Sequence, residues 1–427
     1  MLIGSLFQQA YSLVDAMVVG RFVSGGALAA VGVSANVIVF LTAVLIGLTT
    51  GASVVIAQLY GAKQHERLEN AVSTSVLFLA GLSILIIVFG VAFTPFLLRL
   101  LNTSPDFFED ATVYLRIVMA GMAFPVFYNM YTAYLRALGD SRRPLYILIC
   151  ATLLNTALDI FFVVKLNRGV MGAAVATVIS QMFAAALCYI YTFRSVPLLR
   201  VSRLAFDRQL FRSILKYGAP AALQLSIVSF ANLTITRLIN SFGAAAMAGI
   251  TAVTRIDQIA IMPISTLSMA LSTFVAQNMG AGIEERARQG FRTTLFYMLL
   301  FSVCISVVLM IFSSQLISMF LNQADANTPE ILRIGRAYLH IMVVFYFLFA
   351  FLFAFNGFFR GVGDAVIAMV FPVSSLFIRT LSSYALVGFA GMGPEALAWS
   401  IPIGWGFSSL FSLIYYKKRL WAGKVIT

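Results

Sequence analysis

The chain has 427 residues, of which 61% are hydrophobic and only 11% charged. These proportions exclude a soluble globular protein, because so few charged side chains cannot cover a surface in contact with water. The formal net charge of +13 would favour a nucleic-acid partner in a soluble chain, but the basic residues gather in short loops here. The charge therefore indicates membrane topology, and we expect no nucleic acid to bind.

Apolar runs follow one another along the whole chain, and each is close to the roughly 20 residues that a helix needs to cross a bilayer. Their cores lie at 1–22, 30–58, 72–99, 110–136, 143–164, 170–193, 214–240, 246–278, 291–320, 332–358, 365–389 and 395–416. This predicts an all-α integral membrane protein with twelve transmembrane helices. Because the first run starts abruptly, we expect a polar leader and part of the first helix to precede Met1.

Basic residues are concentrated in every second connection between the predicted spans. Examples are Lys63 after the second span and Arg142 and Arg143 after the fourth, whereas the opposite set holds acids such as Asp106 and Glu109. Connections rich in lysine and arginine stay in the cytoplasm. We therefore expect a multi-pass protein of the cell (inner) membrane with both termini in the cytoplasm. Residues 194–213 are predicted to be a basic linker that lies on the membrane surface.

The two halves of the chain repeat each other. The segment AQLYGA at 57–62 returns as AQNMGA at 276–281, an offset of 219, and RALGD at 136–140 returns as RGVGD at 360–364, an offset of 224. Five residues were therefore gained between, in the loop near 322–328. Each half holds an even number of spans, so the halves share one orientation and are related by a pseudo-twofold axis along the membrane normal. This predicts two six-helix lobes, 1–193 and 214–427, with the motif glycines in tight cytoplasmic turns.

Two carboxylates inside the spans need a reason, because an acid at the bilayer centre costs at least about 2.5–3.5 kcal/mol. They are Asp15 in span one and Asp159 in span five. Asn155 lies one helical turn before Asp159, and Thr177 lies in the small-residue stretch of span six, which lets helices approach closely. These oxygens suit a hard cation, or the carboxylates hold a proton. The alternative is that both acids lie near span ends and are solvated or capped, since Asp159 is close to Lys165.

The second half lacks this set of oxygens. At the repeat positions of Asn155 and Asp159 it has Arg379 and Ser383. We infer that no ion site operates there, and that the Arg379 guanidinium replaces the cation, bonded to backbone carbonyls. Arg255 and Asp257 in span eight form either a local pair or part of a cavity.

Several side chains are expected to line a substrate cavity for apolar cations, where aromatic faces attract positive charge. These are Tyr128, Asn129 and Tyr131 in span four, with Arg255 and Arg379 in the second half. Prolines inside spans are expected to kink or break the helices; they are Pro125, Pro263, Pro372 and Pro402.

Together these residues resemble the multidrug and toxic compound extrusion family along essentially the whole chain. The resemblance is carried by VDAMVVG at 14–20, ALAAVG at 27–32, NTALD at 155–159 and the paired polar motifs. It implies an antiporter that exports organic cations by alternating access in exchange for Na⁺ or H⁺. It also implies a first-lobe coupling site, with Gln8 lining the cavity and the ion bound by Asp15, Asn155, Asp159, Thr177 and the backbone carbonyl of Ala173. We find no acids in spans seven or ten, which indicates the branch with its cation site in the N-terminal lobe.

The expected partners are the bilayer and a small, cationic, amphipathic substrate, and we expect a monomer without a cofactor. No HExxH motif, metal cluster or catalytic triad occurs, so we expect no enzyme activity. The alternative function is a flippase of lipid-linked precursors or polysaccharides from the same superfamily, for which Arg255 and Arg379 would supply a basic cavity.

Overall fold

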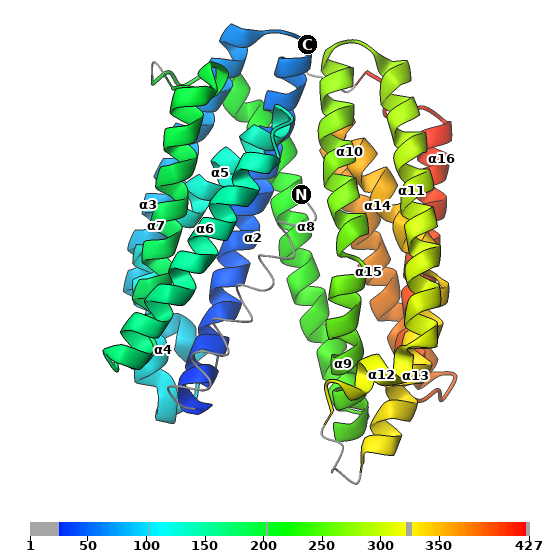
Figure 1. Ribbon diagram of the computed structural model, residues 1–427. Helices are drawn as coiled ribbons and strands as arrows, with labels where there is room; N and C mark the ends of the chain where they lie inside the picture. The colour runs from blue at the N-terminus through cyan, green and yellow to red at the C-terminus, as the bar shows by residue number, and fades with distance from the viewer. Residues whose placement is uncertain (1–24, 102, 202–203, 322–326, 424–427) are drawn as a thin grey trace. The chain divides into compact units, whose positions relative to one another are not determined.

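The computed structural model describes residues 25–101, 103–201, 204–321 and 327–423, and every regular element in these ranges is helical. The helices form two compact units, Met1–Ala222 and Leu223–Thr427. The division falls inside helix α8 (Arg208–Asn240), which is labelled in Figure 1. The predicted linker at 194–213 and lobe boundary at 214 stay predictions.

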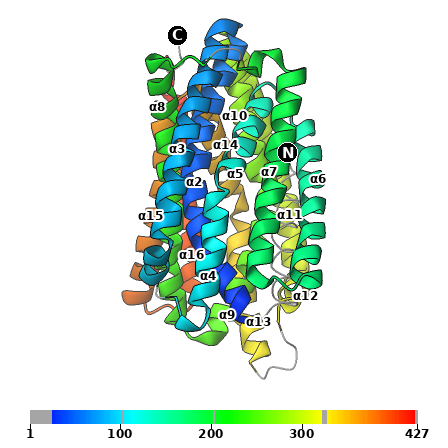
Figure 2. The same ribbon diagram turned by 90° about the vertical axis from the view of Figure 1, so that its left-hand side faces the viewer.

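Six of the predicted spans fall in unit 1, and the first of them, 1–22, lies outside the described residues. Figure 2 faces this unit, with α2 beside α3 and with α6 at the opposite edge next to α7. The elements are α2 (Gly25–Gly61), α3 (His65–Leu100), α4 (Pro105–Ala120), α5 (Ala123–Ala137), α6 (Arg142–Asp159), the π-helix η1 (Ile160–Lys165), α7 (Gly169–Ser195) and the 3₁₀ turn η2 (Pro197–Leu199).

Unit 2 repeats this order. Its elements after α8 are α9 (Ala244–Ala260), α10 (Met262–Gly280), α11 (Glu284–Ile311), α12 (Ser313–Ser318), α13 (Thr328–Val344), α14 (Tyr346–Val362), α15 (Ala365–Gly388) and α16 (Glu395–Lys417). The gain of five residues falls between Ser318 and Thr328, because the elements before this loop keep the first offset and those after it keep the second.

The predicted membrane-spanning architecture is confirmed. The described residues contain 9 helices that are long and apolar enough to cross a membrane, or up to 11 if each bent pair of helices is one span. Among the described residues, four predicted spans are each divided between two α-helices. The runs 110–136, 246–278 and 332–358 divide between α4 and α5, α9 and α10, and α13 and α14, and the run 291–320 divides where α11 ends at Ile311 and α12 begins at Ser313.

The fourth span of each unit breaks at the same register. The pair α4 and α5 is bent by 47° after Gly121, and the pair α13 and α14 is bent by 51° at Phe345. These two positions are equivalent in the repeat. Shared breaks at equivalent residues show that the internal repeat is a repeat of structure as well as of sequence.

Only some prolines act as the sequence predicts. Pro125 lies in the first turn of α5, next to the break, and Pro263 lies at the start of α10, where α9 ends. Pro372 and Pro402 instead lie inside the continuous helices α15 and α16. At these two positions the helix is not broken, and the expected kink stays a prediction.

The two Arg-x-x-Gly-Asp motifs are held by equivalent hydrogen bonds. In unit 1 the hydroxyl of Tyr191 donates to Oδ2 of Asp140 at 2.9 Å. In unit 2 the hydroxyl of Tyr415 donates to Oδ2 of Asp364 at 2.6 Å. Each bond connects the last span of its unit to the turn after the fourth span. The two units are therefore stabilised by equivalent contacts.

The glycines of the two polar motifs have different roles. Gly139 and Gly363 in the Arg-x-x-Gly-Asp turns have φ of 99° and 92°, a left-handed conformation that favours glycine. In the Gln-x-x-Gly motif the glycine ends the helix and lies inside a turn, closed by the N–H of Lys63 on the carbonyl of Tyr60 at 3.1 Å and, in the repeat, by the N–H of Gly282 on that of Met279 at 3.0 Å. The left-handed residues of these turns are Lys63 (φ 58°) and Gly282 (φ 74°), which are equivalent in the repeat. The glycines of both motifs therefore lie in turns, but only those of the Arg-x-x-Gly-Asp motif are left-handed.

The described part of the linker packs on α3. The backbone N–H of Ala205 donates to Oγ of Ser73 at 2.9 Å, and that of Asp207 donates to Oγ1 of Thr74 at 3.0 Å. Leu199 of η2 is 1% exposed. These bonds attach the linker to α3 of unit 1.

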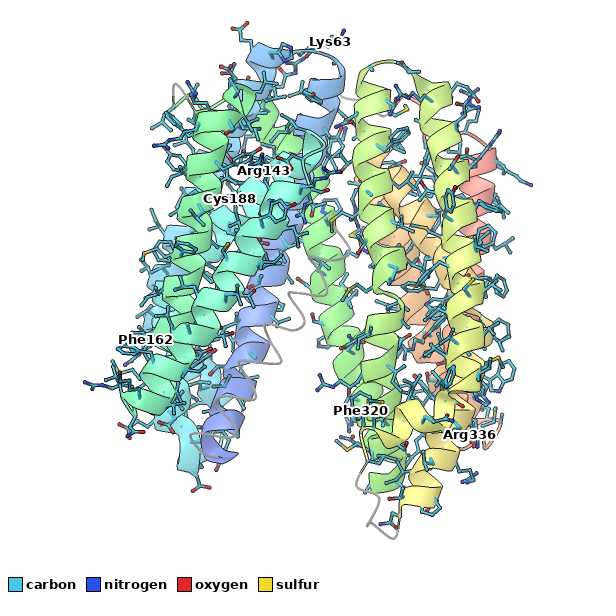
Figure 3. The ribbon with its side chains drawn as sticks, in the orientation of Figure 1. Lys63, Arg143, Phe162, Cys188, Phe320 and Arg336 are labelled. Atoms are coloured by element: carbon cyan, nitrogen blue, oxygen red, sulfur yellow. The ribbon has the colours of Figure 1, made fainter. Side chains whose placement is uncertain are left out.

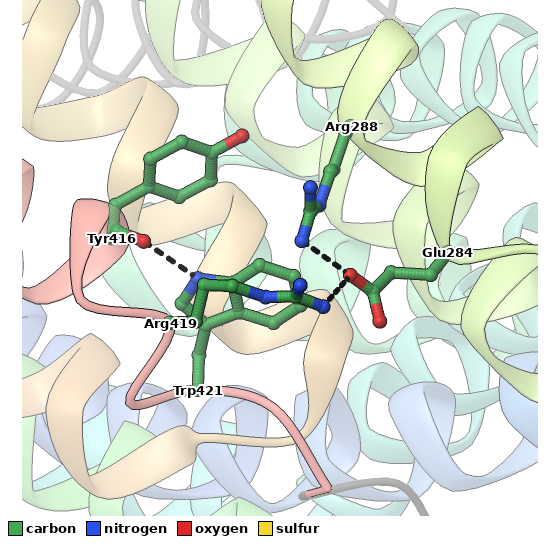
Figure 4. Close-up of polar contacts among 5 residues, drawn as sticks. All are labelled: Glu284, Arg288, Tyr416, Arg419 and Trp421. Carbon is green, nitrogen blue, oxygen red and sulfur yellow. Dashed lines mark hydrogen bonds and ion pairs between the residues drawn. The ribbon is translucent and has the colours of Figure 1, made fainter.

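A C-terminal strap, residues 418–423, closes unit 2 after α16. Figure 4 shows Arg419 and Arg288 converging on Oε1 of Glu284, at 2.6 and 2.5 Å, and Nε1 of Trp421 donating to the carbonyl of Tyr416 at 3.1 Å. The indole of Trp421 is 1% exposed. The strap therefore joins α16 to α11 through an ion-pair network and a buried aromatic ring.

Candidate cation site and identity of the family

One face of α6 and η1 is buried along its whole length. Its side chains recur every four residues, and they are Ile147, Ala151, Asn155, Asp159 and Val163. Asn155 is 1% exposed and Asp159 0%. Since α6 packs against α7, this face is covered by α7. The two polar side chains therefore share one buried face, as their spacing predicts, and the carboxylate of Asp159 is not solvated at a span end.

The α-helix changes to a π-helix directly after Asp159. The N–H of Leu166 donates to the carbonyl of Phe161, and the N–H of Arg168 to that of Phe162, both at 3.0 Å. Single π turns inside helices occur frequently at functional sites. Figure 3 shows Phe162 at one end of unit 1 and Lys63 and Arg143 at the other, so Asp159 lies toward the end away from these basic loops.

Small residues of α7 allow η1 to approach closely. A Cβ on Gly172 would lie 3.1 Å from the backbone carbon of Phe162, so only glycine fits there without displacement. The next residue, Ala173, is fully buried and packs in one cluster with Val163 and Tyr114. The predicted role of the small-residue stretch is therefore confirmed at Gly172.

Two buried polar atoms, Nδ2 of Asn155 on α6 and Oγ1 of Thr177 on α7, lack a hydrogen-bond partner within the described ranges. Leaving a buried polar group unsatisfied costs about 1–3 kcal/mol. Asn155, Asp159 and Thr177 each carry an oxygen atom of the hard type that Na⁺ prefers. Asp15 and Gln8 lie outside the described residues, so this structure does not place them.

Tyr114 on α4 was not predicted as a site residue. It is 5% exposed and lies in the cluster that includes Ala173. Its repeat mate is Tyr338, whose hydroxyl accepts a hydrogen bond from Arg379, the residue equivalent to Asn155. The repeat match between the two tyrosines was the signal in the sequence that could have added Tyr114 to the candidate site.

The three side chains proposed for a cavity in span four have different surroundings. The hydroxyl of Tyr128 donates to the carbonyl of Pro144 at 3.4 Å, and the ring of Tyr131 lies 6.0 Å from that of Tyr189 on α7. Both tyrosines are buried in the packing of unit 1. Asn129 lines a small pocket beside the break of the fourth span, with Thr42, Leu45, Ile46, Thr49, Met122, Pro125 and Val126.

The charged side chains of unit 2 do not pair as the sequence suggested. The carboxylate of Asp257 accepts a hydrogen bond from the hydroxyl of Tyr346 at 2.7 Å, while Arg255 is exposed, so the two neighbours are not a local pair. Arg379 donates to the hydroxyl of Tyr338 at 3.5 Å. Its hydrogen-bond partner is thus a tyrosine and not a backbone carbonyl, because a side chain of the neighbouring α13 reaches it first.

Comparison with known proteins gives one consistent result. The MatE family model matches residues 1–161 and 220–385. The chain is 29% identical to the probable multidrug resistance protein YoeA and 28% identical to YpnP, both of Bacillus subtilis, in each case over 98% of this chain and 93% of the relative.

A crystal structure of MATE in the bent conformation shares the fold, with a TM-score of 0.92 at 24% identity, over 98% of this chain and 93% of that one. The relatives are transporters and not enzymes. The chain therefore belongs to the MatE family of multidrug efflux transporters.

Proposed function

We propose that the chain is an antiporter that exports organic cations or drugs in exchange for inward Na⁺ or H⁺, by alternating access. The observation that carries this proposal is the fully buried carboxylate of Asp159, on one face with Asn155 and against α7. A charge in this position is expensive unless a cation or a proton neutralises it. The ion would be bound by Asn155, Asp159 and Thr177, with Asp15 and the carbonyl of Ala173.

Coupling follows from exchange of the ion for the substrate. If ion and substrate favour different conformations of unit 1, each weakens the binding of the other by the same factor. A cationic substrate suits this arrangement because it leaves when a second positive charge enters the same unit. The relatives' printed role in multidrug resistance supports a small, amphipathic substrate.

We also infer the orientation and the assembly. Figure 3 shows Lys63 and Arg143 at the same end of unit 1, and basic loops stay in the cytoplasm. Both termini would then be cytoplasmic in the cell (inner) membrane, and the chain would act as a monomer without a cofactor.

The test is dye efflux from proteoliposomes in which a Na⁺ gradient and a pH gradient are imposed separately. Asp159→Asn should abolish the dependence of dye efflux on the imposed gradient, because it removes the carboxylate that the ion neutralises. Asp110→Asn, which removes an exposed carboxylate at the start of α4, is the matched control and should leave efflux unchanged. Thr177→Val separates the two ions, because its hydroxyl can bind Na⁺ but does not titrate. It should impair Na⁺-driven efflux more than H⁺-driven efflux if Na⁺ is the ion.

Two results would contradict the proposal. Efflux by Asp159→Asn that still responds fully to both gradients would remove the coupling site. Movement of lipid-linked precursors without any dye efflux would favour the flippase alternative.

A further inference from the structure

Unit 2 contains a network of opposite charges that the transport proposal does not use. Asp257 of α9 and Arg379 of α15 each lie near the middle of a span and are partly buried. Asp257 bonds Tyr346 at 2.7 Å, and Arg379 bonds Tyr338 at 3.5 Å. The two charges form no direct ion pair in the described residues, so the guanidinium acts on the Asp257 carboxylate by attraction over a longer distance. Four elements thus meet through two charges and two phenols.

The internal repeat relates this network to the candidate cation site of unit 1. Tyr338 is equivalent to Tyr114, and Arg379 is equivalent to Asn155 of the candidate cation site. Unit 1 offers an amide and a carboxylate here, whereas unit 2 has Ser383 in place of Asp159 and bonds that serine to the backbone of Arg379. Unit 2 therefore has a fixed positive side chain where unit 1 offers ligands for a mobile ion.

The Arg379 guanidinium is not fully satisfied by hydrogen bonds. Nε of Arg379 is buried without a hydrogen-bond partner in the described part of the chain, and the contact with Tyr338 is long. A guanidinium stays protonated under all physiological conditions, so it cannot dissociate or lose its charge as Na⁺ or H⁺ would. Opposite charges in one partly buried network compensate each other, while either charge alone is less favourable.

The network also surrounds the break of the fourth span in unit 2. Tyr338 lies in α13, before the break, and Tyr346 is the first residue of α14, after it. Tyr338 and Tyr346 belong to one buried cluster with Leu339, Met342 and Val343. The charges of Asp257 and Arg379 therefore hold the two sides of the bend from two different neighbouring spans.

We propose that Arg379 is a resident cation, which keeps Asp257 neutralised and the bend at Phe345 fixed, so that unit 2 is permanently loaded. The mobile ion then acts on unit 1 alone. Only this last consequence rests on the proposed antiport; the pairing of the two charges stands by itself.

Intrinsic fluorescence reads unit 2 selectively, because the three tryptophans of the chain, Trp399, Trp405 and Trp421, all lie in it. The ring of Trp405 is 6.3 Å from that of Tyr346. Thermal unfolding of the purified full chain, followed by this emission, therefore reports on the network without any substrate or gradient.

The first arm is chemical rescue. Arg379→Ala should lower the unfolding temperature, and added guanidinium should raise it again with a saturable dose response, whereas tetramethylammonium at the same concentrations should not. The native chain should show no such rise, and Arg255→Gln, which removes an exposed guanidinium, should behave like the native chain. Absence of rescue in a folded Arg379→Ala protein would overturn the proposal.

The second arm keeps the test valid if Arg379→Ala does not fold. Asp257→Asn leaves the arginine alone, so it should be less stable than the double variant Asp257→Asn with Arg379→Gln, in which no charge is left unpaired. A double variant that is no more stable than Asp257→Asn would overturn the pairing. If the rescue and the double-variant results are as expected but Asp159→Asn does not affect efflux, the role of Arg379 as a resident cation is supported and the antiport mechanism is contradicted.

Discussion

Trp421 offers the sharpest quantitative test of the C-terminal strap. Its indole meets Phe358 edge to face with ring centroids 5.0 Å apart, stacks on Tyr416 at 5.9 Å, and lies 5.3 Å from the guanidinium carbon of Arg288. The ring pairs contribute about 0.5–1.5 kcal/mol each. The cation–π contact adds about 0.5–1 kcal/mol, and the Nε1–H bond about 1 kcal/mol.

These contributions place the cost of Trp421→Ala at about 2.5–5 kcal/mol, which agrees with the 3–5 kcal/mol typical of large aromatic side chains truncated in a core. Trp421→Phe is the matched control, because it keeps a ring in the pocket and loses the Nε1–H bond, for about 1 kcal/mol. The assay is SDS-induced unfolding in mixed micelles, followed by far-UV circular dichroism. If Trp421→Ala costs no more than Trp421→Phe, the ring contacts do not stabilise unit 2 and the strap is not a structural element.

Three further predictions concern the repeat, the packing and the orientation. Tyr415→Phe and Tyr191→Phe should each lower stability by about 1.5–3 kcal/mol in the same unfolding assay, because each removes a hydrogen bond to a carboxylate; a large loss in one and none in the other would contradict their equivalence. Gly357→Val should cost about 1–3 kcal/mol or abolish expression, because its Cβ would meet the carbonyl oxygen of Ser268, whereas Gly357→Ala should cost less. A cysteine placed at Lys63 in a cysteine-free chain should react with an impermeant maleimide only after cells are opened, and labelling of intact cells would reverse the proposed orientation.

Hydrophobic periodicity and length were enough to predict most of the fold. A transmembrane span must be long, apolar and internally hydrogen-bonded, so each long apolar run in the sequence predicts a helix. The repeat was visible because its motifs are polar and keep register, and the structure places Asp140 and Asp364 in equivalent bonds with Tyr191 and Tyr415. The shared buried face of Asn155 and Asp159 followed from helical spacing alone.

The breaks inside spans could not be predicted, because they depend on what packs beside each residue. Pro372 sits in a continuous helix, whereas Phe345 marks a bend of 51° without a proline at the break. Neighbouring side chains decide such points: a Cβ on Gly121, at the equivalent break of unit 1, would meet Val178 of α7 at 2.7 Å. Contacts of this kind, between residues far apart in the chain, cannot be read from the sequence alone.

The sequence by itself determined that this protein has two similar halves of membrane-spanning helices, and that only the first offers acid and amide oxygens at the equivalent positions. Those conclusions need only composition, period and register. The tertiary structure decided how the second half is satisfied instead: Asp257 turns to Tyr346 and Arg379 to Tyr338. The partners of a buried charge are set by helices far apart in the chain, so only the folded unit shows which groups neutralise it.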